Sequence, residues 1–301
     1  MLGSLLGALA ALTLAVPAQA QSAPFINTLP QANVVSKPAP PVKKRIESLG
    51  VKTGAPSVFV ADLASGSVLY AKNPHRTMPI ASLTKLMTAI VLLDQHPDLS
   101  AGVVIKDEDF DRESKTIFKV GDELSYGDLL KTMLVGSVNA SANALARSTL
   151  GKEKFVEAMN RKVAELGLDS PHFTDPSGID PGNQANAADI AALISIASGY
   201  KEIREAAKMP EVIVKGRRTN QTYKVKTTNL LLGGFLNKPP YEIIMAKTGS
   251  LPEAGYCMAQ ITRDAGGHEV IAVELGNDNH FARYQDIKAL TYWAFETYEW
   301  R

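Results

Sequence analysis

Short runs of apolar and β-branched residues, bounded by Gly, Ser or Asp, occur near both ends of the chain and predict β-strands. Residues 56–62 and 67–71 flank the turn-forming pair Ser65–Gly66, which predicts a hairpin. Three further strands are expected late in the chain, at residues 242–247, 255–262 and 269–275. Because these strands follow one another across short turns, they are expected to pair antiparallel.

The middle of the chain has apolar positions at helical spacing instead. A strongly apolar helix is predicted at 83–93, and a closing helix with an aromatic face at 281–298. Further helices are expected at 126–135, 140–150, 153–166 and 185–197, and short strands at 212–214 and 223–226. The order predicts an α+β fold, in which an antiparallel sheet made from both ends of the chain is flanked by helices and carries a helical insertion.

The first twenty residues differ from the rest of the chain. Leu2 to Val16 is apolar and uncharged, and it is followed by Pro17 and by the small-x-small sequence of residues 18–20. This pattern predicts a signal peptide over residues 1–20 that is cleaved after Ala20, and hence export to the periplasm or cell envelope. The apolar run is short for a membrane span of about 20 residues, although an uncleaved anchor remains the second interpretation. Residues 21–44 are rich in Pro and Ala and predict a flexible leader, followed by a single catalytic domain over 45–301.

Charge and composition narrow the possible functions. The net charge of +1 argues against a nucleic-acid partner, since such proteins usually carry a basic excess. The single cysteine, Cys257, excludes an intrachain disulfide and lies mid-strand, where it is expected to be a buried packing residue. The five histidines have no ligand spacing, so neither a metal nor a cofactor is expected.

Three short motifs carry candidate chemistry, and the first is Ser82-Leu83-Thr84-Lys85. At the start of a helix, a spacing of three places the hydroxyl and the amine about one turn apart on one face. A serine needs an adjacent base to become a nucleophile, and a lysine can serve when burial lowers its pKa. A second Ser-x-x-Lys, at Ser198 and Lys201, indicates that the spacing alone is weak evidence.

The other two motifs lie farther along the chain. Ser137-Val138-Asn139 falls between two predicted helices, where a hydroxyl can relay a proton and an amide can hold a substrate backbone. Lys247-Thr248-Gly249-Ser250 is expected to end an apolar strand, so that its backbone can pair with an extended peptide. A similar tripeptide at residues 52–54 precedes the first motif and is therefore out of order.

The ordered set is more specific than its parts. Ser-x-x-K, an S-x-N element and K-T-G in this order form the signature of penicillin-recognising serine enzymes. From Arg45 onward the chain resembles the low-molecular-mass penicillin-binding proteins, the D-alanyl-D-alanine carboxypeptidase and endopeptidase family. The resemblance extends to residues 79–89, 173–178, 180–183 and 254–257. The family usually has Gly at the centre of the second motif, where this chain has Val138.

The resemblance implies the serine β-lactamase-like fold and a role for each motif residue. Ser82 would attack the carbonyl of a D-Ala residue, Lys85 would take its proton, and Asn139 would orient Lys85 and the substrate. Ser137, aided by Lys247, would pass a proton to the departing amine. Lys247 and Thr248 would bind the terminal carboxylate, and Gly249 would allow close backbone approach. The backbone amides of Ser82 and Ser250 would form the oxyanion hole.

The same resemblance implies the partners, which are peptidoglycan peptides as substrates and β-lactam antibiotics as inhibitors, with a peripheral association with the cell envelope. Carboxypeptidase and endopeptidase activities both remain open, and the short layout favours the latter. A β-lactamase is an alternative, but no Glu-x-x-x-Asn follows the second motif, and Glu157 and Asn160 are spaced wrongly. A penicillin-binding sensor or scaffold without turnover is the other alternative. Asp175 and Asp180 are expected to order a loop.

Overall fold

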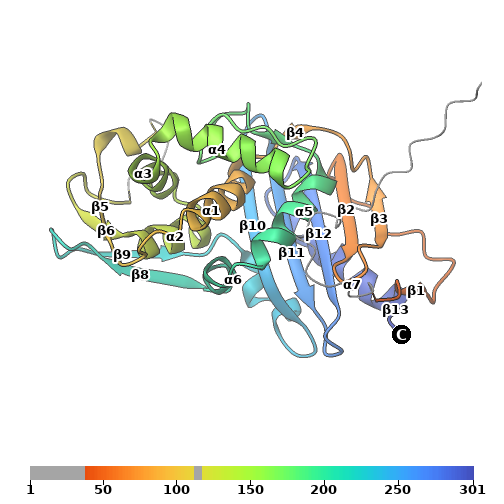
Figure 1. Ribbon diagram of the computed structural model, residues 1–301. Coiled ribbons are helices and arrows are strands. Elements are labelled where there is room, and N and C mark those ends of the chain that lie inside the picture. Colours follow the sequence, from red (N-terminus) through yellow and green to blue (C-terminus); the bar gives the residue numbers. More distant parts are fainter. Residues whose placement is uncertain (1–37, 112–116) are drawn as a thin grey trace, which may run out of the picture.

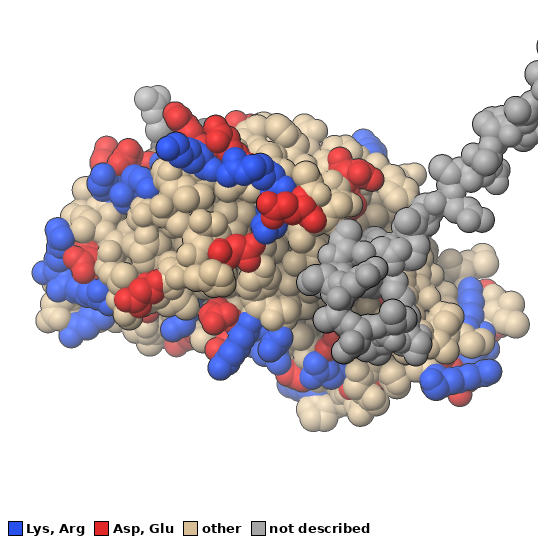
Figure 2. All heavy atoms as spheres, in the orientation of Figure 1, with Lys and Arg blue, Asp and Glu red and all other residues tan. Residues whose placement is uncertain are grey.

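The computed structural model describes residues 38–111 and 117–301 and contains a sheet region beside a helical region (Figure 1). The predicted signal peptide and most of the predicted leader lie outside the described residues. Within those residues, none of the helices combines the length and the apolar character that crossing a membrane requires. On the face shown in Figure 2, basic and acidic side chains are interspersed, and no single sign of charge dominates.

The main sheet has five antiparallel strands in the order β10-β11-β12-β2-β3. They are β2 (Ser57–Asp62), β3 (Val68–Lys72), β10 (Glu242–Leu251), β11 (Gly255–Arg263) and β12 (Glu269–Asn277). The pairing of β12 with β2 joins the two ends of the chain, for example at Val273 and Phe59. The expected sheet is therefore confirmed, and β10 lies at its edge, beside the helical region (Figure 1).

Each face of the sheet is covered by a helix, because the strands are apolar on both sides. Val58, Val60 and Ala272 belong to a cluster with the closing helix α7 (Ala282–Thr297). Phe59 and Val273, on the opposite face, belong to the larger core that includes α5 (Ala187–Ser198). Cys257 is fully buried in that larger core and unpaired, which confirms its packing role.

The helical region surrounds the apolar helix α1 (Lys85–Asp94), which is buried along nearly its whole length. It contacts α2 (Tyr126–Val135), α3 (Asn139–Thr149) and α4 (Lys152–Glu165), and α6 (Lys201–Ala207) packs against α2. The predicted short strands form a hairpin of β8 (Glu211–Lys215) and β9 (Thr222–Lys226). The 3-10 turn η1 (Ala81–Thr84) leads directly into α1 and contacts β10, so the two regions meet at this turn.

The structure differs from the sequence-based expectations in three places. β10 continues to Leu251 instead of ending at Lys247, so the third motif lies inside a strand. Helix α6 and three small strand pairs were not predicted: β1 (Val42–Lys43) with β13 (Tyr298–Glu299), β4 (Met78–Pro79) with β7 (Gln184–Ala185), and β5 (Gly102–Val104) with β6 (Glu123–Ser125). Two- and three-residue strands are too short to have a hydrophobic period. The β1–β13 pair begins three residues before the boundary expected at Arg45.

Glu274 on β12 yields a prediction about stability. Its side chain is fully buried, one carboxyl oxygen accepts a hydrogen bond from Asn277 Nδ2 at 3.3 Å, and the other has no partner. Burial, followed by repulsion from Asp286, raises the pKa of Glu274 to about 9, from an ordinary value near 4.5. Between these two pH values the folded chain keeps a proton that the unfolded chain releases, so this group makes folding less favourable as pH rises.

We therefore expect Glu274→Gln to remove a pH-dependent loss of stability. One unit of pKa shift corresponds to about 1.4 kcal/mol. The free energy of unfolding of Glu274→Gln, relative to that of the parent protein, should therefore rise by roughly that amount per pH unit from pH 5 to pH 8. Urea unfolding at pH 5, 6.5 and 8 measures the free energies. The exposed Glu202→Gln is the control and should leave the slope unchanged. If the free energy of unfolding changes with pH by the same slope in the parent protein and in Glu274→Gln, the raised pKa of Glu274 is contradicted.

Candidate active site

Ser82 lies in η1, at the junction of the sheet region and the helical region, and its side chain is partly exposed. The preceding residue, Ala81, has a φ of 47°, which is unfavourable for a residue with a side chain. Gly178 accommodates this turn, since a Cβ on it would lie 2.1 Å from the Ala81 carbonyl oxygen. The strained turn thus presents the Ser82 hydroxyl at the surface while α1 begins below it.

Lys85, the first residue of α1, has no exposed surface. Its Nζ donates hydrogen bonds to Ser82 Oγ at 2.9 Å, to Asn139 Oδ1 at 2.7 Å and to the Ser177 carbonyl oxygen. Burial lowers the pKa of Lys85 to about 7, although attraction from Asp175 and Asp111 opposes the shift. Near neutral pH a large fraction of this amine is therefore uncharged and able to accept a proton from Ser82.

A loop held by Asp175 supplies the third partner of Lys85. The Asp175 carboxylate accepts hydrogen bonds from the backbone amides of Ser177, Gly178 and Asp180, at 2.5–2.8 Å. It also accepts one from Asn183 Nδ2 at 2.6 Å. These bonds confirm that Asp175 orders the loop, and the ordered loop aims the Ser177 carbonyl at the Lys85 amine.

The second motif lies between α2 and α3, as expected. Ser137 has a φ of 57° and precedes Asn139, the first residue of α3. Val138 is 5% exposed and belongs to the apolar core, so the side chain that replaces the family's Gly packs in the interior. The turn thereby directs Asn139 toward Lys85 and Ser137 toward Lys247.

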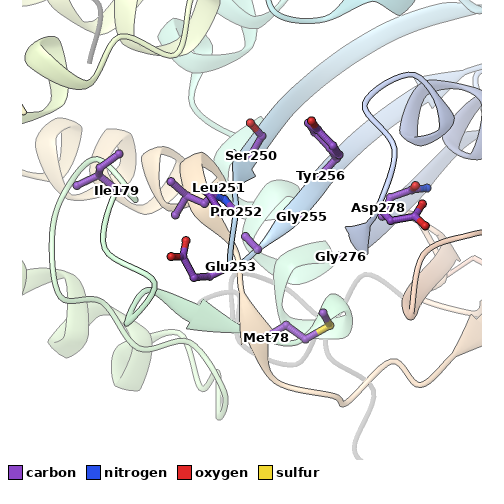
Figure 3. A pocket seen from close by; sticks show the side chains of 12 residues that line it. Met78, Ile179, Ser250, Leu251, Pro252, Glu253, Gly255, Tyr256, Gly276 and Asp278 are labelled. Atoms are coloured by element: carbon purple, nitrogen blue, oxygen red, sulfur yellow. The ribbon is translucent and has the colours of Figure 1, made fainter. Parts of the chain in front are cut away.

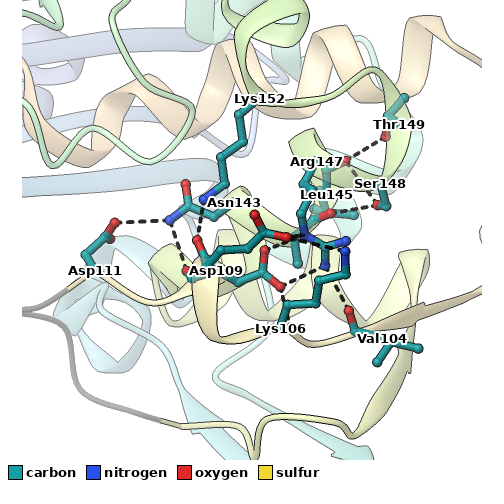
Figure 4. A network of polar contacts seen from close by, with 12 residues as sticks. Val104, Lys106, Asp109, Asp111, Asn143, Leu145, Arg147, Ser148, Thr149 and Lys152 are labelled. Atoms are coloured by element: carbon teal, nitrogen blue, oxygen red, sulfur yellow. Dashed lines mark hydrogen bonds and ion pairs between the residues drawn. The ribbon is translucent and has the colours of Figure 1, made fainter.

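A network of polar contacts fixes the far end of α3 (Figure 4). Arg147 Nε and Nη2 each donate to one oxygen of the buried Asp109 carboxylate, both at 2.8 Å. Asn143 Nδ2 donates to the Asp109 carbonyl at 3.0 Å and to Asp111 Oδ1 at 3.1 Å. Residues 109–111 are therefore bound to α3, and these bonds give the helix that carries Asn139 a defined position.

The third motif runs along the edge strand β10. Lys247 is 1% exposed, and its Nζ donates to Ser137 Oγ and to the Thr248 carbonyl, both at 2.8 Å. Burial, followed by repulsion from Lys85 and Arg283, holds the pKa of Lys247 well below its ordinary value. Ser250 at the end of the motif is exposed. Lys247 is therefore a buried amine that supports Ser137.

Gly249 is required by the contact between β10 and the Ser82 turn. A Cβ on Gly249 would lie 2.7 Å from the Ile80 carbonyl oxygen and 3.2 Å from the Ser82 backbone nitrogen. Any side chain would push the strand and the turn apart. The structure shows a close backbone approach between Gly249 and the segment that carries Ser82, whereas the approach of a bound peptide to Gly249 stays a prediction.

The motifs line an inner cavity of about 290 Å³. Its walls include Ser82, Ser137, Thr248 and Ser250, together with residues that the sequence analysis missed, namely Thr227, Thr228, Leu230, His280, Arg283 and Tyr284. Thr248 Oγ1 donates to Thr228 Oγ1 at 2.7 Å. No local pattern marks the missed residues, because they reach the cavity only through the packing of α7 and of the segment after β9.

Arg283 is the main addition to the site. It is 4% exposed, and its Nη1 donates to the Gly249 carbonyl at 2.9 Å while its Nη2 donates to the Tyr284 hydroxyl at 2.7 Å. Its guanidinium lies over the rings of Tyr256 and Tyr284, at 5.3 and 4.7 Å from the ring centroids. Its Nε has no protein partner among the described residues. Arg283 thus provides a fixed positive charge beside the third motif.

Known proteins provide an independent comparison. The family model described as D-alanyl-D-alanine carboxypeptidase matches residues 43–279. A D-alanyl-D-alanine endopeptidase of Pseudomonas aeruginosa is 33% identical over 261 residues, covering 85% of this chain and 82% of the relative. The D-alanyl-D-alanine carboxypeptidase DacA of Haemophilus influenzae is 31% identical over 255 residues, covering 81% of this chain and 63% of the relative.

Solved structures agree with these relatives. The DD-transpeptidase of Streptomyces K15 superposes with a TM-score of 0.76 at 27% identity, over 83% of this chain and 100% of that one. A D-alanyl-D-alanine carboxypeptidase from Mycobacterium tuberculosis superposes with a TM-score of 0.74 at 27% identity, over 85% of this chain and 96% of that one. The expected fold, an antiparallel sheet with helical flanks and a helical insertion, is that of these enzymes.

The network around Asp109 yields a prediction about stability. Arg147→Met should destabilise the fold by about 3 kcal/mol, because the Asp109 carboxylate loses its paired cation while it stays fully buried. Arg161→Met is the matched control, since Arg161 and Glu157 form an exposed pair on α4 whose loss should cost less than about 1 kcal/mol. Urea unfolding of both variants at pH 7 measures the costs, and similar costs for the two would contradict the role given to Arg147.

Proposed function

The chain belongs to the family of D-alanyl-D-alanine carboxypeptidases, and from this premise we propose that its motif residues form the catalytic site of a serine DD-peptidase. The enzyme hydrolyses the peptide bond that follows a D-Ala residue in peptidoglycan stem peptides or their cross-links. The observation that carries the proposal is the buried Lys85 amine, whose pKa is lowered to about 7 and which lies 2.9 Å from the Ser82 hydroxyl. A base at hydrogen-bonding distance is what a serine nucleophile requires.

In the proposed acylation step, Ser82 Oγ attacks the carbonyl carbon of the D-Ala residue, and the Ser82 proton moves to Lys85 Nζ. The backbone amides of Ser82 and Ser250 stabilise the oxyanion of the tetrahedral intermediate, a contribution typically worth about 10²–10³-fold in rate per donor. The carbon–nitrogen bond then breaks, and the leaving amine takes a proton through the Ser137 hydroxyl. Water hydrolyses the resulting ester and regenerates Ser82.

We divide the binding of the departing residue between Thr248 and Arg283. Both side chains line the inner cavity, whereas Lys247 lies beneath it and donates to Ser137 Oγ. Arg283 lines the inner cavity, and the aromatic rings that hold its guanidinium support a carboxylate at this position, because arginine binds such groups with fixed geometry. In this assignment Lys247 acts on proton transfer through Ser137, and Arg283 acts on substrate orientation.

Two features bear on the β-lactamase alternative and on the choice between carboxypeptidase and endopeptidase activity. A class A β-lactamase uses a Glu and an Asn in a loop to activate the deacylating water, but Asn160 lies on α4 and exchanges two hydrogen bonds with the Phe173 backbone. This structural use of Asn160 disfavours that alternative. The chain spans 82% of the endopeptidase relative and 63% of the carboxypeptidase DacA. Both relatives belong to the family that this chain matches, so cross-link cleavage and release of a terminal D-Ala both stay in the proposal.

The proposal includes the setting in which the enzyme acts. A peptidoglycan substrate lies outside the cytoplasm, which agrees with the signal peptide expected at residues 1–20 and cleaved after Ala20. We therefore propose export to the periplasm, with residues 45–301 as the catalytic domain and with peripheral association with the envelope. β-Lactams would acylate Ser82 in place of the peptide. A sensor that is acylated without turnover would give the adduct but no peptide hydrolysis.

Replacing the nucleophile tests the function directly. Ser82→Ala should abolish labelling by a fluorescent penicillin and hydrolysis of cross-linked muropeptides, read by gel and by mass spectrometry. Ser198→Ala is the matched control, since Ser198 has the same Ser-x-x-Lys spacing but hydrogen-bonds the Ser195 carbonyl. Release of D-Ala or splitting of dimers identifies the activity. Labelling or hydrolysis by Ser82→Ala at the parent rate would overturn the assignment.

The pKa of Lys85 predicts the pH dependence of acylation. Below about pH 7 the amine becomes protonated and cannot accept the Ser82 proton. The second-order rate constant for penicillin labelling should therefore rise about tenfold per pH unit below pH 7 and level off above it. Stopped-flow labelling from pH 5.5 to 8.5 measures the profile. Lys85→Arg, which stays protonated, should lose most of the rate at every pH, and a flat parent profile would exclude Lys85 as the base.

A further inference from the structure

The backbone turn that carries Ser137 is held from two sides. On one side the Lys247 amine donates to Ser137 Oγ at 2.8 Å. On the other side lies the β8–β9 hairpin, and just after β9 the backbone N–H of Thr228 donates to the Val135 carbonyl at 3.0 Å. Because Ser137 has a φ of 57°, the turn is unfavourable by itself, and its shape depends on these neighbours.

Gly136 faces Val225 where the turn meets the hairpin. A Cβ on Gly136 would overlap with Cγ1 of Val225, whereas the next nearest atoms, the Lys226 and Thr132 carbonyl oxygens, would lie at 3.5 Å, an ordinary contact distance. The φ of Gly136 is −96°, so its backbone conformation is open to residues with a side chain. The glycine is therefore needed for the space that Val225 occupies, and Val225 is a buried, β-branched side chain with little freedom to move.

The hairpin is fixed at its far end by Asp122. Four hydrogen bonds reach this buried carboxylate from the hairpin, donated by the hydroxyls of Thr219 and Tyr223, at 2.5 and 2.6 Å, and by the backbone amides of Arg218 and Thr219, both at 3.2 Å. Both strands of the hairpin also contact α2, beside which they run in Figure 1. With these restraints the hairpin presents Val225 to Gly136 at a defined position.

The segment after β9 joins the hairpin to the site. Thr228 Oγ1 accepts a hydrogen bond from Thr248 Oγ1 at 2.7 Å, and Thr227 and Thr228 both line the inner cavity. A larger cavity of about 790 Å³ adjoins the inner one at Ser250 (Figure 3), and none of the described hairpin residues lines it. The hairpin therefore meets the site on the side where Ser137 and Thr248 lie.

Resting on the proposed function, in which Ser137 passes a proton to the leaving amine, we propose that the β8–β9 hairpin positions Ser137 for this step and that Val225 and Gly136 are its positioning residues. Their contact sets where the Ser137 hydroxyl lies relative to the leaving nitrogen. Ser82 and Lys85 belong to η1 and α1, so a shift of the Ser137 turn leaves the attacking pair in place. The hairpin thus acts on the breaking of the carbon–nitrogen bond and not on the attack by Ser82.

The leaving atom distinguishes this role from a general structural one. When an amide is cleaved, the nitrogen keeps the electron pair of the carbon–nitrogen bond and takes the proton that Lys85 received from Ser82, passed on through the Ser137 hydroxyl. When a thioester is cleaved, the sulfur leaves as a thiolate and needs no proton, because the ordinary pKa of a thiol is only about 8.5. A displaced Ser137 hydroxyl should therefore slow amide cleavage and spare thioester cleavage.

The test compares Nα,Nε-diacetyl-L-Lys-D-Ala-D-Ala with the thioester in which D-thiolactate replaces the departing D-Ala. Both substrates keep the departing carboxylate and form the same acyl-enzyme, so kcat/KM reports acylation in each case. Gly136→Ala should lower kcat/KM for the amide on the order of 10²-fold, the typical cost of misplacing a reacting group by about 1 Å, and change the thioester value less than about threefold. Release of D-Ala and of thiol measures the two rates.

Rescue identifies the contact that is responsible. In Gly136→Ala/Val225→Ala the space that the new methyl needs is vacated, so most of the amide rate should return. Gly233→Ala is the control, because a Cβ there meets nothing within 4 Å, and it should leave both rates unchanged. Equal losses for the two substrates in Gly136→Ala, or a double variant as slow as Gly136→Ala, would overturn the inference.

Ser137→Ala separates this inference from the function on which it rests. If Ser137→Ala slows the amide alone and Gly136→Ala slows neither substrate, the inference is overturned and the proposed function stands. If Ser137→Ala slows both substrates equally, the proton route of the proposed function is overturned, and the role of the hairpin with it. Thioester cleavage by the parent protein without amide cleavage would also overturn the inference, because Ser137 would then deliver no proton to a leaving amine.

Discussion

The burial of two lysine amines between the sheet and the helical region is the constraint on which the site depends. A charged ammonium is costly to remove from water, so a buried lysine must have hydrogen-bond partners or lose its proton. Lys85 has both solutions, since three oxygens accept from its Nζ and its pKa is lowered to about 7. Those three oxygens belong to η1, α3 and the loop held by Asp175, so one amine connects three segments of the chain.

Close backbone contacts make this burial possible. The Ser82 turn fits between β10 on one side, where Gly249 leaves room for the Ile80 carbonyl, and the 175–180 loop on the other, where Gly178 leaves room for Ala81. The unfavourable φ of Ala81 is tolerated because packing on both sides determines it. The nucleophile is thus held by the backbone around it, and a partly exposed serine can have a defined position next to a fully buried base.

The sequence predicted the parts of this arrangement that depend on local spacing or on motif order. Ser82 and Lys85 are one turn apart, and the long strands and helices had clear apolar periods. The burial of Lys247 was not predictable, because a lysine near a strand end is usually solvated, and its contact with Ser137 joins residues 110 positions apart. Arg283 could not be found for the same reason, since it reaches the cavity only when α7 packs on the sheet. The order of the three motifs supplied the long-range information that periodicity lacks.

The proximity of the two amines also bears on the direction of proton transfer in the proposed mechanism. Repulsion from Lys85 contributes to the lowered pKa of Lys247, and electrostatic repulsion is mutual. When Lys85 takes the Ser82 proton, a positive charge forms inside a site that already contains Arg283 and the Lys247 amine. That charge raises the free energy of the intermediate until a proton reaches the leaving amine through Ser137, the hydroxyl that Lys247 holds at 2.8 Å. A protonated Lys85 with a pKa near 7 gives up its proton readily, and the leaving α-amine, whose ordinary pKa is about 7.7–8.0, is the stronger base, which favours transfer of the proton to it.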